Sequence, residues 1–469
     1  MSSSLDYTTL STALEQQELF ENKTWRLSPY AYAITHEEFG EIEKIGVACL
    51  EFHKALENLY LKSVQGKNIL RNRELAAPWV AEYLERGKPE SVVAWNRSGR
   101  LRGMFPPVIR PDLIVTKEGF SVTEMDSVPG GIGLTAFLNR LYGKSDSAIL
   151  GREDLMLTGF YGAMARLAPE KHSPMIAIAV SEEAATYRPE MLWLAQELRG
   201  LGKRVYCVRP EELIPLGGAL HLDIEGSPEK LDVIYRFFEL YDLENIPNMD
   251  FILEAVENQE VQVAPPLRTF QEEKLALALF HHHRLEEYWK ENLSRAGRKV
   301  LRGLIPESWV VDPAPLPPGA VFMGPKIGSR PPADWRELSR ASQKDRNLIL
   351  KISGFHETAE GARSVLLGSD CSREEWSEGI DEAIERSATN PYILQRYRKP
   401  LRTRHPIYRD NGEVEDREGR TRLCPYFFNQ GDSVAFGGIL ATFCPADKKI
   451  IHGMTDAAML PCRLVEGKE

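Results

Sequence analysis

Apolar residues recur at two different periods along the chain, and the changes of period predict where helices and strands lie. From about residue 36 to 88, apolar positions stand three and four residues apart on a charged background, which is typical of amphipathic helices. The segments DLIVT and FSVTEMD then predict two short strands joined by a turn at residues 117–119. VPGGIGLTAFLNRLYG continues as a glycine-rich turn that leads into a helix.

The middle of the chain predicts a unit of alternating strand and helix. Residues 176–180 form an apolar run, residues 191–201 have the pattern of a helix, Gly202 ends it, and residues 205–208 form a second apolar run. Two strands that are joined through a helix pair in parallel, so this unit predicts a parallel sheet. LDVIYRFFEL adds a further strand, and a helical stretch, EEKLALALFHHHRLEEYWKENL, leads out of the unit.

The last third of the chain returns to short β-type runs. NLILKISG and PYILQRY are separated by the helical segment SREEWSEGIDEAIERSA, and from RTRLCPYFFNQGDSVAFGGILATF onward the pattern is that of antiparallel strands. The predicted fold is therefore mixed, α/β in its middle and α+β elsewhere. A chain of 469 residues is too long for one simple core, so we expect two or three sub-domains.

Composition and charge exclude several classes of protein. Hydrophobic residues make up 43% of the chain and charged residues 27%, which is ordinary for a globular protein. The net charge of −10 disfavours a nucleic-acid partner, because phosphate backbones are bound by clustered Lys and Arg. The polar N-terminus, the lack of a run of ~20 apolar residues and the scattered cysteines predict a cytoplasmic protein without a membrane span, zinc site or disulfide framework.

Four charged residues on the two predicted strands form the first candidate site. If the strands pair as a hairpin, Asp112 lies near Glu124, and Glu124 and Asp126 leave the same face of their strand. Three carboxylates repel one another unless a cation neutralises them, and magnesium is bound by carboxylates together with nucleotide phosphates. Arg110 shares the face of Asp112 and can clamp a phosphate or a carboxylate. The same spacing also fits an exposed hairpin with ordinary surface charges.

The segment LILKISG places a lysine where an anion is expected. Lys351 has apolar neighbours on both sides, and burying an unpaired ammonium group is costly, so a nucleotide phosphate is a candidate partner; a lysine that reaches water at a strand end is the alternative. The small residues after it let backbone N–H groups approach phosphates, and Arg363 adds charge. Gln395 can mark a hinge at which backbone groups bind adenine. The nucleotide-binding candidates here are Lys351, Ser353, Gly354, Gly361, Ser364 and Gln395.

In this order, the motifs resemble the synthetase domain of the glutathionylspermidine synthase family, a circularly permuted branch of the ATP-grasp enzymes. That family has an R-x-D strand followed by an E-x-N strand; here RPD and EMD match, with Asp126 in place of the Asn. RKVLRGLIPESWVV resembles the family's lysine-bearing helix before an LFP stretch and supplies Lys299. LKISG resembles its KP-x-x-G strand, with Ile352 in place of the proline, and PYILQRY resembles its YI-x-Q strand.

The resemblance implies roles for these residues. Asp112, Glu124 and Asp126 would hold magnesium, Lys299 and Lys351 would contact ATP phosphates, and the catalytic residues would be Arg110, Lys351 and Arg363. The implied fold is a circularly permuted ATP-grasp fold, like that of glutathione synthetase, with an inserted βαβ domain of the preATP-grasp kind. Its parts would be an N-terminal helical region (1–105), metal-binding strands (106–173), the inserted α/β domain (174–265) and the ATP-grasp lobes with a lid loop (266–469).

The implied activity is that of an ATP- and magnesium-dependent ligase that joins a small-molecule carboxylate to an amine through an acyl-phosphate. Peptides and polyamine-like compounds are among the candidate substrates. Two alternatives stay open. One is a nucleotide-binding ATP-grasp-like protein without ligase chemistry, which the departures at Asp126 and Ile352 favour. The other is a metal-dependent nucleotide-sugar transferase, in which paired acidic residues hold the metal.

Overall fold

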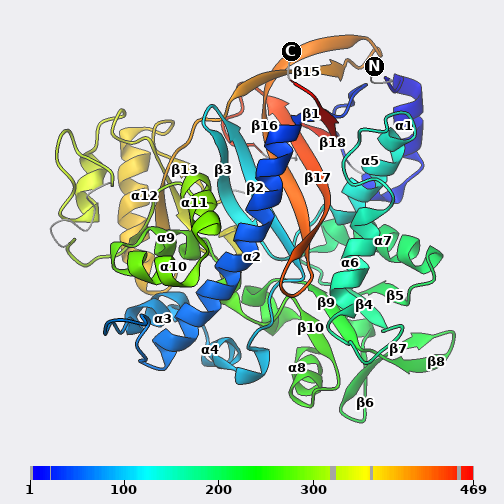
Figure 1. Ribbon diagram of the computed structural model, residues 1–469, viewed down its shortest axis with the longest axis horizontal. Coiled ribbons are helices and arrows are strands. Elements are labelled where there is room, and N and C mark those ends of the chain that lie inside the picture. The colour runs from blue at the N-terminus through cyan, green and yellow to red at the C-terminus, as the bar shows by residue number, and fades with distance from the viewer. Residues whose placement is uncertain (1–3, 22, 317–323, 360–362, 452–455, 468–469) are drawn as a thin grey trace.

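Four β-sheets organise the computed structural model, which describes residues 4–21, 23–316, 324–359, 363–451 and 456–467 (Figure 1). The largest has seven strands in the order β1-β18-β17-β16-β2-β3, with β15 paired to β16. Its pairs are antiparallel except the parallel pair β1–β18. The strands are β1 (Tyr32–Thr35), β2 (Val108–Thr116), β3 (Gly119–Asp126), β15 (Arg402–Tyr408), β16 (Val414–Asn429), β17 (Val434–Pro445) and β18 (Ala458–Val465).

Helices cover both faces of this seven-stranded sheet. The long helix α2 (His36–Val64) crosses one face, where Leu423 and Phe427 of β16 belong to its hydrophobic core (Figure 1). Helices α5 (Ile132–Gly143) and α6 (Leu155–Ala165) lie on the other face, against Cys424 and Phe428. A capping box starts α2, because the Thr35 side chain accepts a hydrogen bond from the N–H of the third helical residue, whose carboxylate accepts one in return.

The predicted βαβ unit forms a parallel sheet in the order β10-β9-β4-β5, as the sequence pattern indicated. All five positions of both β4 and β9 are buried, which explains their continuous apolar runs. Its elements are β4 (Ile176–Val180), α7 (Arg188–Gly200), β5 (Val205–Val208), β9 (Val233–Phe237), α8 (Met249–Glu257) and β10 (Gln262–Ala264). A three-stranded antiparallel sheet extends from it, made of β6 (Ile214–Leu216), β7 (Ala219–Ile224) and β8 (Ser227–Lys230).

The fourth sheet is antiparallel and has the order β11-β14-β12-β13; we call it the lysine sheet because β12 carries Lys351. Its strands are β11 (Ser308–Val311), β12 (Leu348–Ile352), β13 (Leu366–Leu367) and β14 (Tyr392–Arg396). Helix α12 (Arg373–Glu385) packs on it through Trp376 and Ile380 (Figure 1).

The remaining helices are shorter than the sequence pattern suggested. The helical stretch predicted near residue 280 is divided into α9 (Leu275–His281) and α10 (Glu286–Asn292), because His282 between them has an extended backbone. The region from 36 to 88 is likewise interrupted after α2, and a second helix starts only at Pro78. The shorter helices near the N-terminus and before β11 are α1 (Tyr7–Glu15), α3 (Pro78–Glu85), α4 (Glu90–Arg97) and α11 (Arg295–Leu304).

Gly87, in the turn after α3, packs closely against the segment that leads into β14. This residue has a φ of 74°, and a Cβ added to it would lie 1.6 Å from the carbonyl oxygen of Thr389. Gly87→Ala therefore imposes both a strained backbone and a shift of the facing chain, and we expect it to lower the free energy of unfolding by about 2–4 kcal/mol. Urea denaturation measures this loss. Gly66→Ala is the control, since Gly66 has a φ of 60° and open space around it, so about 1 kcal/mol is expected. Equal losses would show that the close contact is unimportant.

Candidate functional site

The two acidic strands pair in the predicted hairpin. Asp112 lies opposite Glu124, and Arg110 lies opposite Asp126. The half-buried guanidinium of Arg110 bridges both sides, since its Nε donates to Asp112 Oδ1 at 2.8 Å and its Nη2 lies 2.8 Å from Asp126 Oδ2. Its Nη1 donates to the carbonyl of Gly130 at 3.1 Å. The hairpin is thus built around an arginine held by two carboxylates.

A second arginine reaches Asp112 from the neighbouring strand β16. Arg422 pairs in register with Ile114 of β2, and its Nη1 lies 3.0 Å from Asp112 Oδ2. Two residues further along the same strand, Cys424 Sγ donates to Asp112 Oδ1 at 3.4 Å. Asp112 has no exposed surface, so the two guanidinium groups offset the cost of burying its charge.

Lys351 connects the lysine sheet to the hairpin. Its side chain is buried, and Nζ donates to the carbonyl of Thr123 at 2.7 Å and to Gln395 Oε1 at 3.1 Å. Gln395 Nε2 in turn donates to Ser308 Oγ at 2.9 Å. The predicted nucleotide-binding residues Lys351 and Gln395 therefore stand side by side, on β12 and β14, and face the hairpin.

Lys274 is a second buried lysine at this place, and it belongs to none of the predicted motifs. Its Nζ lies 3.1 Å from Glu124 Oε2 and donates to the carbonyl of Ala359 at 3.1 Å. The signal in the sequence was a charged pair, Glu273-Lys274, directly before the wholly apolar LALALF of α9. A lysine in that position is buried with the start of the helix and requires a partner.

Burial and neighbouring charges shift the pKa values of these groups. Burial, with the like charge of Lys274, lowers the pKa of Lys351 to about 7, against the opposing effect of Glu124. Burial alone would raise the pKa of Glu124, but the nearby ammonium groups lower it to about 2. Burial raises the pKa of Asp126, although Arg110 opposes the shift. We call the seven residues Arg110, Asp112, Glu124, Asp126, Lys274, Lys351 and Arg422 the charge cluster.

The carboxylates of the charge cluster do not fit a metal ion as they are arranged. Both oxygens of Asp112 contact arginines, and Asp126 Oδ1 accepts from the N–H of Val128 at 2.9 Å while its Oδ2 faces Arg110. Glu124 is paired with a lysine. In the described ranges no three His, Cys, Asp or Glu side chains are grouped around one possible ion position. Magnesium binding by Asp112, Glu124 and Asp126 therefore stays a prediction.

The other predicted site residues range from buried to exposed. Ser353 is buried, its Oγ donating to Glu273 Oε2 at 2.9 Å, and a Cβ on Gly354 would lie 2.8 Å from Glu273 Cγ. Arg363 is exposed and donates to the carbonyl of Glu357, whereas Ser364 is half-buried. Gly361 lies outside the described residues.

Lys299, to which the resemblance gave a phosphate-binding role, lies on a different element from Lys274 and Lys351. It lies exposed on α11, a helix that packs against α2 and β3. None of the hydrogen bonds or ion pairs between described residues joins its side chain to the charge cluster. The described structure thus brings Lys274, rather than Lys299, beside Lys351 and Glu124.

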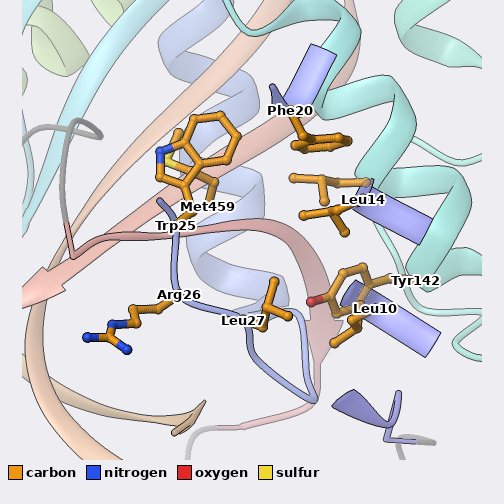
Figure 2. A pocket seen from close by; sticks show the side chains of 9 residues that line it. Leu10, Leu14, Phe20, Trp25, Arg26, Leu27, Tyr142 and Met459 are labelled. Carbon is orange, nitrogen blue, oxygen red and sulfur yellow. The ribbon is translucent and has the colours of Figure 1, made fainter. Parts of the chain in front are cut away.

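Two hollows lie elsewhere in the molecule. Figure 2 shows the first, where Leu10, Phe20 and Trp25 of the N-terminal segment face Tyr142 and Met459. Its volume of about 10 Å³ holds one water molecule at most. The second, of about 390 Å³, is an open depression beside Asn139 and Arg152. Neither hollow is lined by a residue of the charge cluster. The two lysines of the cluster are buried, whereas the side chains of Glu124, Asp126 and Arg422 are 25%, 23% and 22% exposed.

Comparison with known proteins decides the fold. Neither a protein-family profile nor a curated protein matches the sequence. The solved apo structure of a glutathione synthetase-like effector from Globodera pallida is similar, with a TM-score of 0.57, 12% identity, and coverage of 98% of this chain and 96% of that one. The chain has the fold of that effector.

Two further structures are similar only in part. A candidate gamma-glutamylcysteine synthetase from Methylobacillus flagellatus has a TM-score of 0.42 at 13% identity and covers 81% of this chain and 86% of its own. D-alanyl-alanine synthetase A from Vibrio cholerae has a TM-score of 0.26 at 7% identity, over 62% of this chain and 89% of its own. Such low TM-scores add no weight to the comparison. The mixed α+β, glutathione synthetase-like fold therefore rests on the first structure.

No described helix combines the length and the apolar composition that crossing a membrane requires.

Proposed function

We propose that this chain is an ATP-dependent ligase that joins a small-molecule carboxylate to an amine through an acyl-phosphate. One observation carries the proposal. Two buried lysines, Lys274 and Lys351, contact the hairpin that bears Arg110. Such a concentration of cations suits a triphosphate and a reacting carboxylate. The glutathione synthetase-like fold supports it.

The residues have distinct roles in the proposed reaction. Lys274 and Lys351 bind the phosphates, and Arg110 orients the substrate carboxylate against the γ-phosphate. A carboxylate oxygen forms a bond to that phosphorus as the bond to ADP breaks. The amine nitrogen then attacks the acyl carbon, phosphate leaves, and the nitrogen loses a proton to give the amide. Gln395 holds Lys351 in place through its Oε1.

Entry of ATP requires the charge cluster to open. Lys351 and Lys274 are 4% and 7% exposed, and Lys351 bonds to the backbone of β3 at Thr123. We propose that the lysine sheet moves away from the hairpin to admit the nucleotide and closes again over it. Closure excludes water, which an acyl-phosphate intermediate needs because it hydrolyses readily.

Product analysis tests the proposed function. The full chain is incubated with ATP and pools of carboxylic acids, amino acids, peptides and amines, and ADP and phosphate are measured. Release that requires both an acid and an amine supports the ligase. Release with an acid alone, or none with any pair, contradicts it. Parallel assays with EDTA test the magnesium prediction independently.

The pairing of every acidic side chain in the cluster favours a second candidate, a nucleotide-binding protein without ligase chemistry. Asp112, Glu124 and Asp126 each contact a cation of the protein itself. In this candidate ATP binds to the opened cluster without turnover. Isothermal titration with ATP and with a non-hydrolysable analogue separates the ligase from the binding protein. If ATP and the analogue give equal heats of binding and no ADP forms, the protein binds ATP without turnover.

A further inference from the structure

A fully buried ion pair lies next to the charge cluster and belongs to none of the predicted motifs. Lys88 Nζ is 2.6 Å from Glu273 Oε1, and the two side chains are 1% and 2% exposed. Lys88 comes from the turn between α3 and α4, directly after Gly87, whereas Glu273 directly precedes Lys274. Burying two charges so completely is costly, so this pair is weak evidence for stability and calls for another reason.

Hydrogen bonds connect this ion pair to the two chain segments that carry Lys274 and Lys351. Glu273 Oε2 accepts from Ser353 Oγ at 2.9 Å, and Ser353 Oγ accepts from the N–H of Leu275 at 3.0 Å. The carbonyl of Ser353 accepts from the N–H of Lys274 at 2.9 Å. Ser353 follows Lys351 by two residues. Glu273 therefore links the start of α9 to the end of β12.

Lys274 and Lys351 require such a link because their charges repel one another. Each is buried, and at short range in a low dielectric environment two ammonium groups move apart unless the backbone holds them. Glu124 attracts both ammonium groups and lies 3.1 Å from that of Lys274, but it acts on the side chains and not on the main chain. The contacts of Glu273 fix the main chain of Lys274, and Lys88 orients the Glu273 carboxylate. Lys88 also lies over the Phe355 ring, 5.5 Å from its centroid, which fixes the ammonium group further.

We propose that Lys88 and Glu273 are positioning residues for Lys274, and that they hold Lys274 beside Lys351 for binding the phosphates of ATP. The inference rests on the proposed function in one respect only, namely that Lys274 and Lys351 bind phosphate. It assigns to the N-terminal region, otherwise packed as helices, a part in the assembly of the site.

The test compares stability with ATP affinity in four variants. Lys88→Met leaves a buried carboxylate unpaired, and we expect a lower Tm and an ATP Kd at least tenfold higher. Lys88→Met combined with Glu273→Leu removes both charges, so its Tm recovers while its ATP Kd stays at least tenfold higher. Lys88→Arg keeps the charge and restores affinity to within threefold. Arg86 lies on the same turn as Lys88 and pairs with Asp312. Arg86→Met breaks that pair, so it is the matched control, and it is expected to bind ATP as the wild type does.

Two results would overturn the inference. One is an ATP Kd of the double variant within twofold of the wild-type value, which would show a merely structural pair. The other is an equal loss of affinity in Arg86→Met, which would show a general effect of disturbing the turn.

Amine-reactive labelling, read by mass spectrometry, gives a measurement that does not depend on ATP. Lys274 is expected to react at least fivefold faster in the double variant than in the wild type, with exposed Lys299 as the internal reference. If the wild type binds no ATP, the proposed function fails, but the labelling still decides: an unchanged Lys274 rate would show that Lys88 and Glu273 do not position it.

Discussion

Replacing Lys351 with methionine is expected to lower kcat/KM for ATP by about 10²–10³-fold without destabilising the fold. Removing a preorganised group that stabilises the charge developing in the transition state costs activity on this scale. Methionine has a similar volume, and it relieves the desolvation that lowers the pKa of Lys351. The lowered pKa shows that burial of this charge costs stability, so removing it should leave the free energy of unfolding unchanged or higher. Loss of activity with unchanged or higher stability is thus the expected signature of a functional lysine.

Lys299→Met is the matched control for this substitution. The family resemblance gave both lysines the same role, but Lys299 is exposed on α11, so its loss should change kcat/KM by less than about twofold and Tm hardly at all. Lys274→Met should lower kcat/KM to a similar extent, but with a lower Tm, because it leaves Glu124 without its lysine partner. If Lys299→Met removes activity and Lys351→Met does not, the charge cluster is the wrong site.

Local patterns in the sequence were sufficient to predict the hairpin and its charges. The two-residue period of strands places Arg110 and Asp112 on one face. The tight turn fixes the register only as far as Leu113, and a shift of register there, which the pattern did not predict, sets Asp112 opposite Glu124. Lys351 was found by a similar local argument, since a lysine inside an apolar strand requires a partner. Each of these inferences uses residues within about one turn or one strand of each other, where chain geometry limits the possibilities.

Contacts between distant segments could not be predicted in this way. Lys274 meets Glu124 only because α9 and the hairpin are brought together by the packing of α2 and the lysine sheet, and Arg422 meets Asp112 through the register of β16 on β2. Lys88 and its partner Glu273 are likewise far apart along the chain. Nothing in the spacing of these residues encodes the pairing, because tertiary packing sets it. The resemblance assigned Lys299 from the order of the motifs alone, and its phosphate-binding role stays a prediction.

The proposed domain boundaries illustrate the same limit. The region 1–105 was expected to be helical, yet β1 within it pairs with β18 at the other end of the chain. A strand of four residues beside a long helix gives little signal by itself, and its partner lies more than 400 residues away. The seven-stranded sheet thus unites both ends of the chain around the hairpin.

Binding of ATP is expected to take up a proton above pH 7 and to weaken as the pH rises. Lys351 has a pKa of about 7 in the free protein, so its amine is largely neutral at pH 8 and must be protonated to pair with a phosphate. The association constant should therefore fall by about tenfold per pH unit between pH 8 and 10 and level off below pH 7. Isothermal titration at pH 8.5 in buffers of different ionisation enthalpy measures the uptake, which Lys351→Met should abolish.

The same group should make the stability of the protein depend on pH. Because the folded-state pKa of Lys351 lies below its ordinary value of 10.5, the unfolded chain binds more protons between pH 7 and 10.5. The free energy of unfolding should then rise with pH in that window by about 1.4 kcal/mol per unit, with the full destabilisation present below pH 7.

Glu239 acts in the opposite direction, since burial and the charge of Glu272 raise its pKa to about 8 and its contribution to stability is lost as the pH rises towards that value. The difference between wild type and Lys351→Met cancels the Glu239 contribution, which both proteins share. The advantage of the variant should therefore be largest below pH 7 and shrink steadily towards pH 10. A difference that does not change with pH would show that Lys351 keeps an ordinary pKa, and the buried ammonium at the centre of the site would then lack the electrostatic environment described above.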